Sequence, residues 1–224
     1  MATVTVGTII GRANTLLNDP GFIRWPKQEL LDYYNDATRA IVLVRPDANV
    51  ASVEFTCVSG TKQSLPSNAL KLLDVVRNAG GHAIRYVDRA AIDANYPDWH
   101  SGNTANKVEA YCLDERSPKA FYLYPGPSAG VDVDIVYSVA PVAKTLAEVE
   151  SVDTPAVADL DDIYINPLLD WIMYRAFSKD AEWSANGNRA TAHYQAYSDQ
   201  LGLKTQVDQA LEQRKDAQFS RGAR

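Results

Sequence analysis

The sequence predicts an α+β protein, because helical periodicity at both ends of the chain encloses a middle part with strand alternation. Near the start, and again after about residue 162, apolar residues recur every three or four positions, the spacing of one helix face. In between, the period changes to two, which indicates strands with one buried face. Terminal helices commonly pack together, so we expect a four-helix unit with an inserted antiparallel β-meander and a C-terminal extension.

This pattern divides the chain into four segments. Residues 1–47 carry the N-terminal helices and residues 148–202 the C-terminal helices of the helical unit. Residues 48–147 form the β sub-domain, and residues 203–224 form the extension. No internal repeat is visible.

Two helices are expected in the first segment. The first, with its apolar stripe from Val6 to Leu17, should end at Asn18-Asp19-Pro20-Gly21, because Pro and Gly resist helix continuation. The second should begin at Trp25-Pro26, since proline suits the first helical turn, and should end at Arg45-Pro46.

The middle of the chain predicts short strands joined by turns. Val53, Phe55 and Cys57 alternate with polar residues, and a hairpin turn is expected at Ser59-Gly60-Thr61-Lys62. A second turn is expected at Ala79-Gly80-Gly81. The remaining expected elements are strands at 63–66, 72–76, 84–87, 108–113, 120–124 and 131–139, and a short helix at 88–95.

Two more helices are expected after an acidic connector, Glu148 to Asp162. The first has a dense apolar stripe from Ile165 to Phe177 and should be broken at Asn186-Gly187-Asn188. The second carries its stripe from Ala190 to Leu201, with Gly202 as a candidate C-terminal cap.

Composition narrows the class of protein. The 224 residues include 22 Lys and Arg against 28 Asp and Glu, a net charge of −6, which argues against a protein whose main task is binding nucleic acid. No apolar run approaches the roughly 20 residues of a membrane span, and no secretory signal is visible. Two cysteines do not make a disulfide scaffold.

Side chains that carry catalysis are scarce. His82, His100 and His193 lack partners at the spacing of metal ligands, so we interpret them as surface or half-buried histidines. Cys57 and Cys112 fall on expected strands among apolar or small neighbours, which favours core cysteines over nucleophiles. Glycine-rich phosphate loops and the nucleophile elbow are also missing.

Aspartates 153, 159, 161 and 162 form the single carboxylate cluster of the sequence. They could hold a divalent cation or supply paired acid and base groups. They also precede a helix, whose N-terminus favours negative charge and offers unpaired N–H groups. The pattern lacks the glycine and distal glutamate of a calcium loop, so the capping interpretation is preferred.

Aromatic residues are numerous but lack interleaved Lys and Arg. We therefore interpret them as core and interface material rather than as a base-stacking surface. The set comprises Tyr33, Tyr34, Tyr111, Phe121, Tyr122, Tyr124, Tyr137, Tyr194 and Tyr197.

The order of several short signatures resembles a known family. They include Trp25-Pro26 with Glu29-Leu30-Leu31, Tyr34-Asn35-Asp36-Ala37, Gly60-Thr61, Leu65-Pro66, Val76-Arg77-Asn78, Phe121 to Pro125, Pro141, Pro167-Leu168-Leu169-Asp170, Tyr174-Arg175-Ala176, Lys179-Asp180-Ala181-Glu182, Arg189-Ala190 and His193-Tyr194. From about Thr8 to Leu203 the chain is similar to the head-to-tail adaptor (connector) proteins of short-tailed bacteriophages, relatives of tail tubular protein A.

The resemblance implies a structural virion protein that is not an enzyme and needs no cofactor or metal. Twelve copies would form a ring that joins the portal protein to the tail nozzle, with DNA passing through the lumen without sequence-specific binding. The ring would lie at the head–tail junction of the virion, its subunits in the host cytoplasm during assembly, with no membrane partner. The alternatives are another phage neck or tail-completion ring protein, and a metal-dependent hydrolase using Asp159, Asp161 and Asp162.

Residues 203–224 lie beyond the resemblance and differ from the rest of the chain. Five basic against three acidic residues give this segment a net charge of +2 in an acidic protein. Too few of its residues are apolar for a stable isolated helix, so we expect it to order on binding. The hypothesis is a portal-docking arm that uses Val207, Leu211, Phe219, Arg221 and Arg224.

Overall fold

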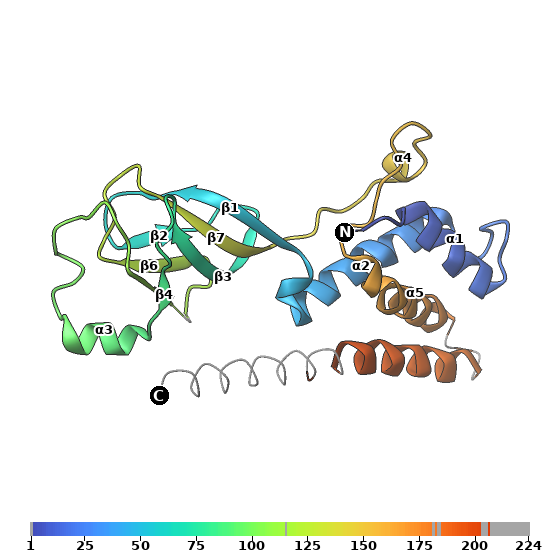
Figure 1. Ribbon diagram of the computed structural model, residues 1–224. Coiled ribbons are helices and arrows are strands. Elements are labelled where there is room, and N and C mark those ends of the chain that lie inside the picture. The colour runs from blue at the N-terminus through green and yellow to red at the C-terminus, as the bar shows by residue number, and fades with distance from the viewer. Residues whose placement is uncertain (1, 115, 181, 183–184, 203–205, 207–224) are drawn as a thin grey trace, which may run out of the picture. The chain divides into compact units, whose positions relative to one another are not determined.

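The computed structural model describes residues 2–114, 116–180, 182, 185–202 and 206. The chain divides into two compact units, one made of Met1–Arg45 with Pro141–Arg224 and the other of Pro46–Ala140 (Figure 1). The first is helical and the second contains the strands, which confirms the α+β class. No described helix combines the length and apolarity needed to cross a bilayer.

The first two helices begin and end where the sequence predicts. Helix α1 (Val6–Leu17) follows Thr5, whose hydroxyl accepts from the Thr8 N–H, and it ends at Asn18 in the left-handed conformation with φ of 55°. Helix α2 (Lys27–Val44) follows Pro26. Their fully buried side chains are Val6, Ile9, Ile10, Ala13, Leu30, Leu31, Tyr34, Ala37 and Ile41.

Helix α5 (Ile165–Lys179) contacts both α1 and α2. A further helix, residues 185–202, packs along α5 through aromatic rings, with the Trp171 and Tyr197 centroids 4.9 Å apart. The break between the two helices was expected at Asn186-Gly187-Asn188, which is wrong, because these residues lie in the first turn of the second helix. First-turn N–H groups have no partner within a helix, so Asn and Gly are tolerated there. Gly202 is itself helical rather than a cap.

The second unit contains two sheets. In the first, strands β1 (Val50–Thr56), β7 (Asp132–Val139) and β3 (Ala69–Asn78) lie in the order β1-β7-β3, all antiparallel. In the second, β2 (Lys62–Ser64), β6 (Ala120–Tyr124), β5 (Ala110–Leu113) and β4 (Arg85–Tyr86) lie in the order β2-β6-β5-β4. Strand β4 pairs with β5 in parallel.

The expected β-meander is therefore wrong in its strand order, although the strands lie near their expected positions. The turn after β1 does not close a hairpin, because it passes the chain from one sheet to the other. Gln63, which is fully buried, donates to the carbonyls of Val58 and Gly60 and accepts from the Val58 N–H. These bonds hold the turn in a shape that leads β2 away from β1. Gly60 has φ of 103°, a conformation that suits glycine.

The turn expected at Ala79-Gly80-Gly81 is present, with Gly80 and Gly81 both at positive φ. The chain after this turn first bridges back to β3, with Ala83 opposite Arg77, and strand β4 then pairs with β5. The Asn78 side chain explains the direction, because its amide donates to the Val108 carbonyl and accepts from the Val108 N–H, both at 2.8 Å. This buried bridge ties the end of β3 to the chain that leads into β5.

The two sheets share one hydrophobic core. Phe55 contacts Phe121 across it, with ring centroids 5.8 Å apart. The fully buried members include Ala69, Val75, Val108, Phe121, Leu123, Val133 and Ile135. A smaller cluster of Ile92, Trp99 and Cys112 lies under helix α3 (Arg89–Asn95), the short helix expected at 88–95, and the Asp88 side chain caps this helix.

Candidate functional site

Two aspartates of the acidic segment make structural contacts at the start of α5. The Asp161 carboxylate accepts from the Ile163 N–H at 3.2 Å and caps the 3-10 turn η2 (Asp162–Tyr164) that leads into α5. The Asp162 carboxylate accepts from the Thr3 hydroxyl and N–H and from the Val4 N–H. These bonds, the hydroxyl bond above all, hold the pKa of Asp162 below its ordinary value. The capping interpretation is confirmed for Asp161, whereas Asp162 instead ties the N-terminal segment to the start of η2.

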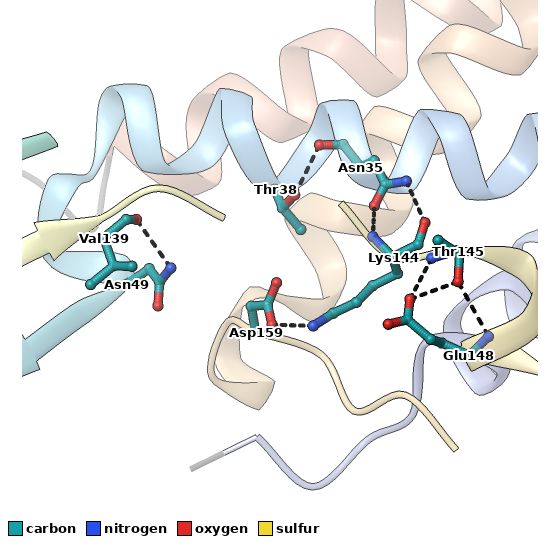
Figure 2. Close-up of polar contacts among 8 residues, drawn as sticks. All are labelled: Asn35, Thr38, Asn49, Val139, Lys144, Thr145, Glu148 and Asp159. Carbon is teal, nitrogen blue, oxygen red and sulfur yellow. Dashed lines mark hydrogen bonds and ion pairs between the residues drawn. The ribbon is translucent and has the colours of Figure 1, made fainter. Parts of the chain in front are cut away.

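Asp159 has a different partner. It binds the ammonium group of Lys144 at 2.5 Å, and both side chains are largely shielded from solvent. Lys144 is itself held by Asn35 of α2, whose amide donates to the Lys144 carbonyl at 3.0 Å and accepts from its N–H at 2.9 Å. Figure 2 shows Lys144 between these two side chains. The two hydrogen bonds between Asn35 and Lys144 therefore hold the loop after β7 against α2.

The four aspartates do not assemble into a cation site. Asp153 is exposed in the turn that Ser151 and Thr154 stabilise. Across the part of the chain that the structure describes, no three His, Cys, Asp or Glu side chains gather in a way that could hold a metal ion. The hydrolase alternative, which needs Asp159, Asp161 and Asp162 together at a metal, gains no support from this geometry.

A capping box that begins at Thr145, just before the acidic connector, was missed at the level of sequence. Thr145 accepts from the Glu148 N–H, and the Glu148 carboxylate accepts from the Thr145 N–H and hydroxyl (Figure 2). It starts helix α4 (Leu146–Val149). The spacing of a threonine three residues before a glutamate is the signal that could have found it.

The loop between α1 and α2 is built around one carboxylate. Asp19, which is 9% exposed, accepts from the N–H groups of Ile23, Arg24 and Trp25 at 2.9 to 3.1 Å. These donors, led by Trp25, lower the pKa of Asp19. The Trp25 indole N–H in turn donates to the Ala176 carbonyl at 3.2 Å, which ties the loop to α5.

The three histidines are surface or half-buried residues, as predicted. His82 is exposed in the glycine turn. His100 shares a hydrogen bond with the Thr61 hydroxyl at 2.8 Å and stacks on Trp99. His193 lies 2.8 Å from Asp170 of α5, so it joins the last two described helices.

Both cysteines lie in the core of the second unit, which confirms the prediction. Cys57 is 2% exposed and Cys112 is 0% exposed, and they belong to different clusters. Burial raises the pKa of each thiol to about 11. A thiol with this pKa is almost entirely protonated at neutral pH and is a poor nucleophile.

The aromatic set is mainly core material. Tyr34, Tyr111, Phe121, Tyr137 and Tyr197 are each at most 5% exposed. Tyr33, Tyr122 and Tyr124 are partly buried, and Tyr194, exposed at 47%, packs beside Tyr174 with centroids 5.2 Å apart. A role of these rings at an interface stays a prediction.

A pocket of about 430 Å³ was not predicted from the sequence. It lies between the loop after α3 and the turn after β6, where Tyr96 stacks on Tyr124 with centroids 5.4 Å apart. Trp99, Pro125 and Gly126 complete its apolar wall. Asp98 is its one carboxylate, so the pocket holds no paired acid and base.

The predicted docking residues Val207, Leu211, Phe219, Arg221 and Arg224 all lie outside the described residues, as does the rest of the 203–224 segment except position 206. The arm therefore stays a hypothesis of the sequence.

In the helical unit, the carboxylates of Asp19, Asp159, Asp161 and Asp162 cap a helical turn or hold loops and the N-terminal segment in place. Residues 4–221 match the family model described as SU10 adaptor protein, and the chain belongs to that family. The membership confirms the resemblance to phage head-to-tail adaptors and makes the protein a phage adaptor, a structural component of the virion. No curated protein matches the chain.

Proposed function

We propose that this adaptor forms a ring of twelve copies that joins the portal protein to the tail nozzle and surrounds the DNA channel at the head–tail junction. The observation that carries the proposal is the family match over residues 4–221, which includes both units of the chain. Subunits would be made in the host cytoplasm and join the virion during assembly.

Exposed apolar side chains in both units support contacts with neighbouring molecules. Ile23 is 87% exposed and Leu43 is 82% exposed in the helical unit, and Val58 is 60% exposed in the β unit. Isolated apolar residues are common on protein surfaces, but interface cores also draw on such residues. A ring uses two different faces of each subunit in contacts that close on themselves, so both units can contribute.

The charge of the chain suits a channel that releases DNA. Twelve copies at −6 each carry −72 together, and a negative wall repels the phosphate backbone. DNA would therefore pass without being bound, and no base-specific contact is needed.

The 203–224 segment is proposed as the arm that docks on the portal. Its apolar residues Val207, Leu211 and Phe219 would pack against a portal groove, and Arg221 and Arg224 would pair with acidic portal side chains. The net +2 of the segment, opposite in sign to the rest of the chain, favours such a separate role.

Electron microscopy of negatively stained mixtures tests the function. Full-length protein added to purified portal rings should give rings bound coaxially to portals. A chain truncated after Gly202 should keep its circular dichroism spectrum and fail to bind. A full-length variant with Val207→Ser and Leu211→Ser should bind weakly, whereas the control Gln206→Ser, at the position before Val207, should bind normally.

The other outcomes separate the remaining candidates. Rings that form without joining portals would favour another neck or tail-completion role. Normal joining by the truncated chain would exclude the arm. Hydrolysis that requires a divalent cation and disappears in Asp159→Asn would replace the adaptor function with an enzymatic one.

A further inference from the structure

Strand β1 has a free edge. Its one strand partner in the described part of the chain is β7, with an uninterrupted register from Val50 opposite Ser138 to Thr56 opposite Asp132. At the other margin of the sheet, β3 continues into a bridge between Arg77 and Ala83. Every second residue of β1, beginning with Val50, is exposed. An unpaired edge of seven residues is therefore available to another strand.

The backbone directions on this edge follow from the pairing with β7. The Cys57 N–H donates to the Val131 carbonyl and the Val139 N–H donates to the Asn49 carbonyl, both at 2.8 Å. Since backbone groups of successive residues point to opposite edges, the odd-numbered residues face β7. The even-numbered residues direct their N–H and C=O groups to the free edge; they are Val50, Ser52, Glu54 and Thr56.

The edge lacks the features that natural sheets use to prevent edge pairing. It contains no proline, no lysine and no bulge, and Glu54 is its one charged residue. Strand β3, by contrast, has three register irregularities, between 69 and 71, 72 and 74, and 75 and 77. A regular, exposed and nearly uncharged edge is a template for strand addition.

We propose that this edge pairs with β1 of a second copy of the chain, antiparallel and about a two-fold axis at Val53. Ser52 of each copy would then lie opposite Glu54 of the other, and Val50 opposite Thr56. In this register the four residues that direct their N–H and C=O groups to the free edge lie opposite residues of the same kind in the partner strand. Every backbone donor and acceptor on the edge is therefore used.

The side chains of β1 select this register and this partner. On the core face, Val53 is 37% exposed and would meet its own copy, while partly buried Phe55 would lie opposite the small Ala51. Large residues thus oppose small ones. A pairing shifted by two residues would place Glu54 opposite Glu54 of the partner, and like charges directly opposite each other destabilise a sheet. Glu54 already faces Asp134 of β7, whose carboxylate is bound by Arg77.

The β1–β1 dimer would form between isolated chains and does not depend on the proposed ring of twelve copies. A two-fold contact uses the same patch on both partners and closes at two copies. A ring must therefore be built from other faces. If portal joining fails, this dimer is still testable, and if the dimer is absent, the adaptor function is untouched.

Sedimentation velocity of the full chain tests the pairing. The unmodified protein should reversibly form dimers as its concentration rises. Ser52→Pro removes an N–H that faces the free edge, a position where edge strands tolerate proline, so the fold should survive. Its self-association should weaken at least tenfold, because the dimer loses two hydrogen bonds and the proline side chain blocks the approach of the partner strand. Ser52→Ala keeps the N–H and should dimerise normally.

A cross-linking variant gives a second readout that does not depend on tolerance of proline. Val53→Cys should form a disulfide-linked dimer under a mild oxidant, since paired α-carbons at a non-hydrogen-bonded position lie about 4.5 Å apart. Glu54→Cys, diagonal to its own copy at about 7 to 8 Å, should cross-link poorly. A chain that stays monomeric, a dimer indifferent to Ser52→Pro, or equal cross-linking at 53 and 54 would each overturn the proposal.

Discussion

At the scale of single residues, Asn35 joins two segments that are far apart in the sequence. Its side chain is 8% exposed and satisfies both backbone groups of Lys144, which is 109 positions away. Asn35→Ala leaves the partly buried N–H and carbonyl of Lys144 without partners, so it should lower the free energy of unfolding by about 2 to 4 kcal/mol. Denaturation in urea measures the change.

Two substitutions control this prediction. Asn35→Asp keeps the acceptor for the Lys144 N–H and should cost less than Asn35→Ala. Asn95→Ala removes one exposed hydrogen bond, to the Ala91 carbonyl, and should change the free energy of unfolding by at most about 0.5 kcal/mol. Equal losses at 35 and 95 would contradict the role assigned to Asn35.

Asp19 makes the stability of the helical unit depend on pH. Because its pKa is lower in the folded chain than the ordinary 3.8, its charged form stabilises the fold above that value, and the benefit is lost as pH falls through the lower folded pKa. Asp19→Asn should therefore lower the melting temperature at pH 7, and its deficit against the unmodified chain should shrink below about pH 4.

Calorimetry between pH 2.5 and 7 measures this difference. Asp153→Asn is the matched control, since Asp153 is exposed, and its melting temperature should follow that of the unmodified chain. A deficit at position 19 that stays constant with pH would mean that the loop does not depend on the charge.

At the scale of elements, two glycines should respond to alanine with opposite sign. Gly11 is exposed in α1 with open space around an added Cβ, so Gly11→Ala should stabilise the protein by about 0.5 to 1 kcal/mol. At Gly126 the same atom would lie 3.1 Å from the Thr61 side chain and 3.2 Å from Gly60. Gly126→Ala should therefore destabilise it by about 1 to 3 kcal/mol. Urea denaturation of both variants measures the contrast, and the same sign for both would refute it.

Elements whose signal is local were predictable from the sequence. The stripe from Val6 to Leu17 specifies α1, and alternation around Val133 and Ile135 specifies β7, because each buried face is encoded in adjacent turns or pleats. The capping box at Thr145 was also readable, although it was missed. Strand partners were not, since β1 pairs with β7 across about 80 residues and nothing local distinguishes it from β2.

At the scale of the whole molecule, each unit has its own core. Ile135 in the β unit and Leu168 in the helical unit are both fully buried. Either residue changed to alanine should cost about 2 to 5 kcal/mol. We expect hydrogen exchange to accelerate mainly within the unit that carries the substitution, with residues 46–140 responding to Ile135→Ala and α1, α2 and α5 responding to Leu168→Ala. Acceleration spread evenly over both units would show that they unfold as one.

In the candidate site, too, some features could be predicted from local sequence and others depend on contacts between distant segments. The lack of metal-ligand partners near the three histidines could be predicted from neighbouring residues. The burial of Cys57 and Cys112 could be predicted in the same way. The distinct partners of Asp159 and Asp162 could not, because Thr3 lies at the other end of the chain from Asp162, and Lys144 reaches Asp159 only in the folded helical unit. The pocket beside Tyr96 and Tyr124 likewise joins residues from separate loops.

By itself, the sequence determined where most helices and strands lie, the α+β class and the adaptor family, because periodicity and short signatures are properties of neighbouring residues. Only the tertiary structure decided which strands pair, which carboxylate holds which loop, and that β1 keeps an open edge. Those features depend on groups far apart in the chain, whose meeting reflects the balance of core packing, buried hydrogen bonds and loop closure over the whole fold.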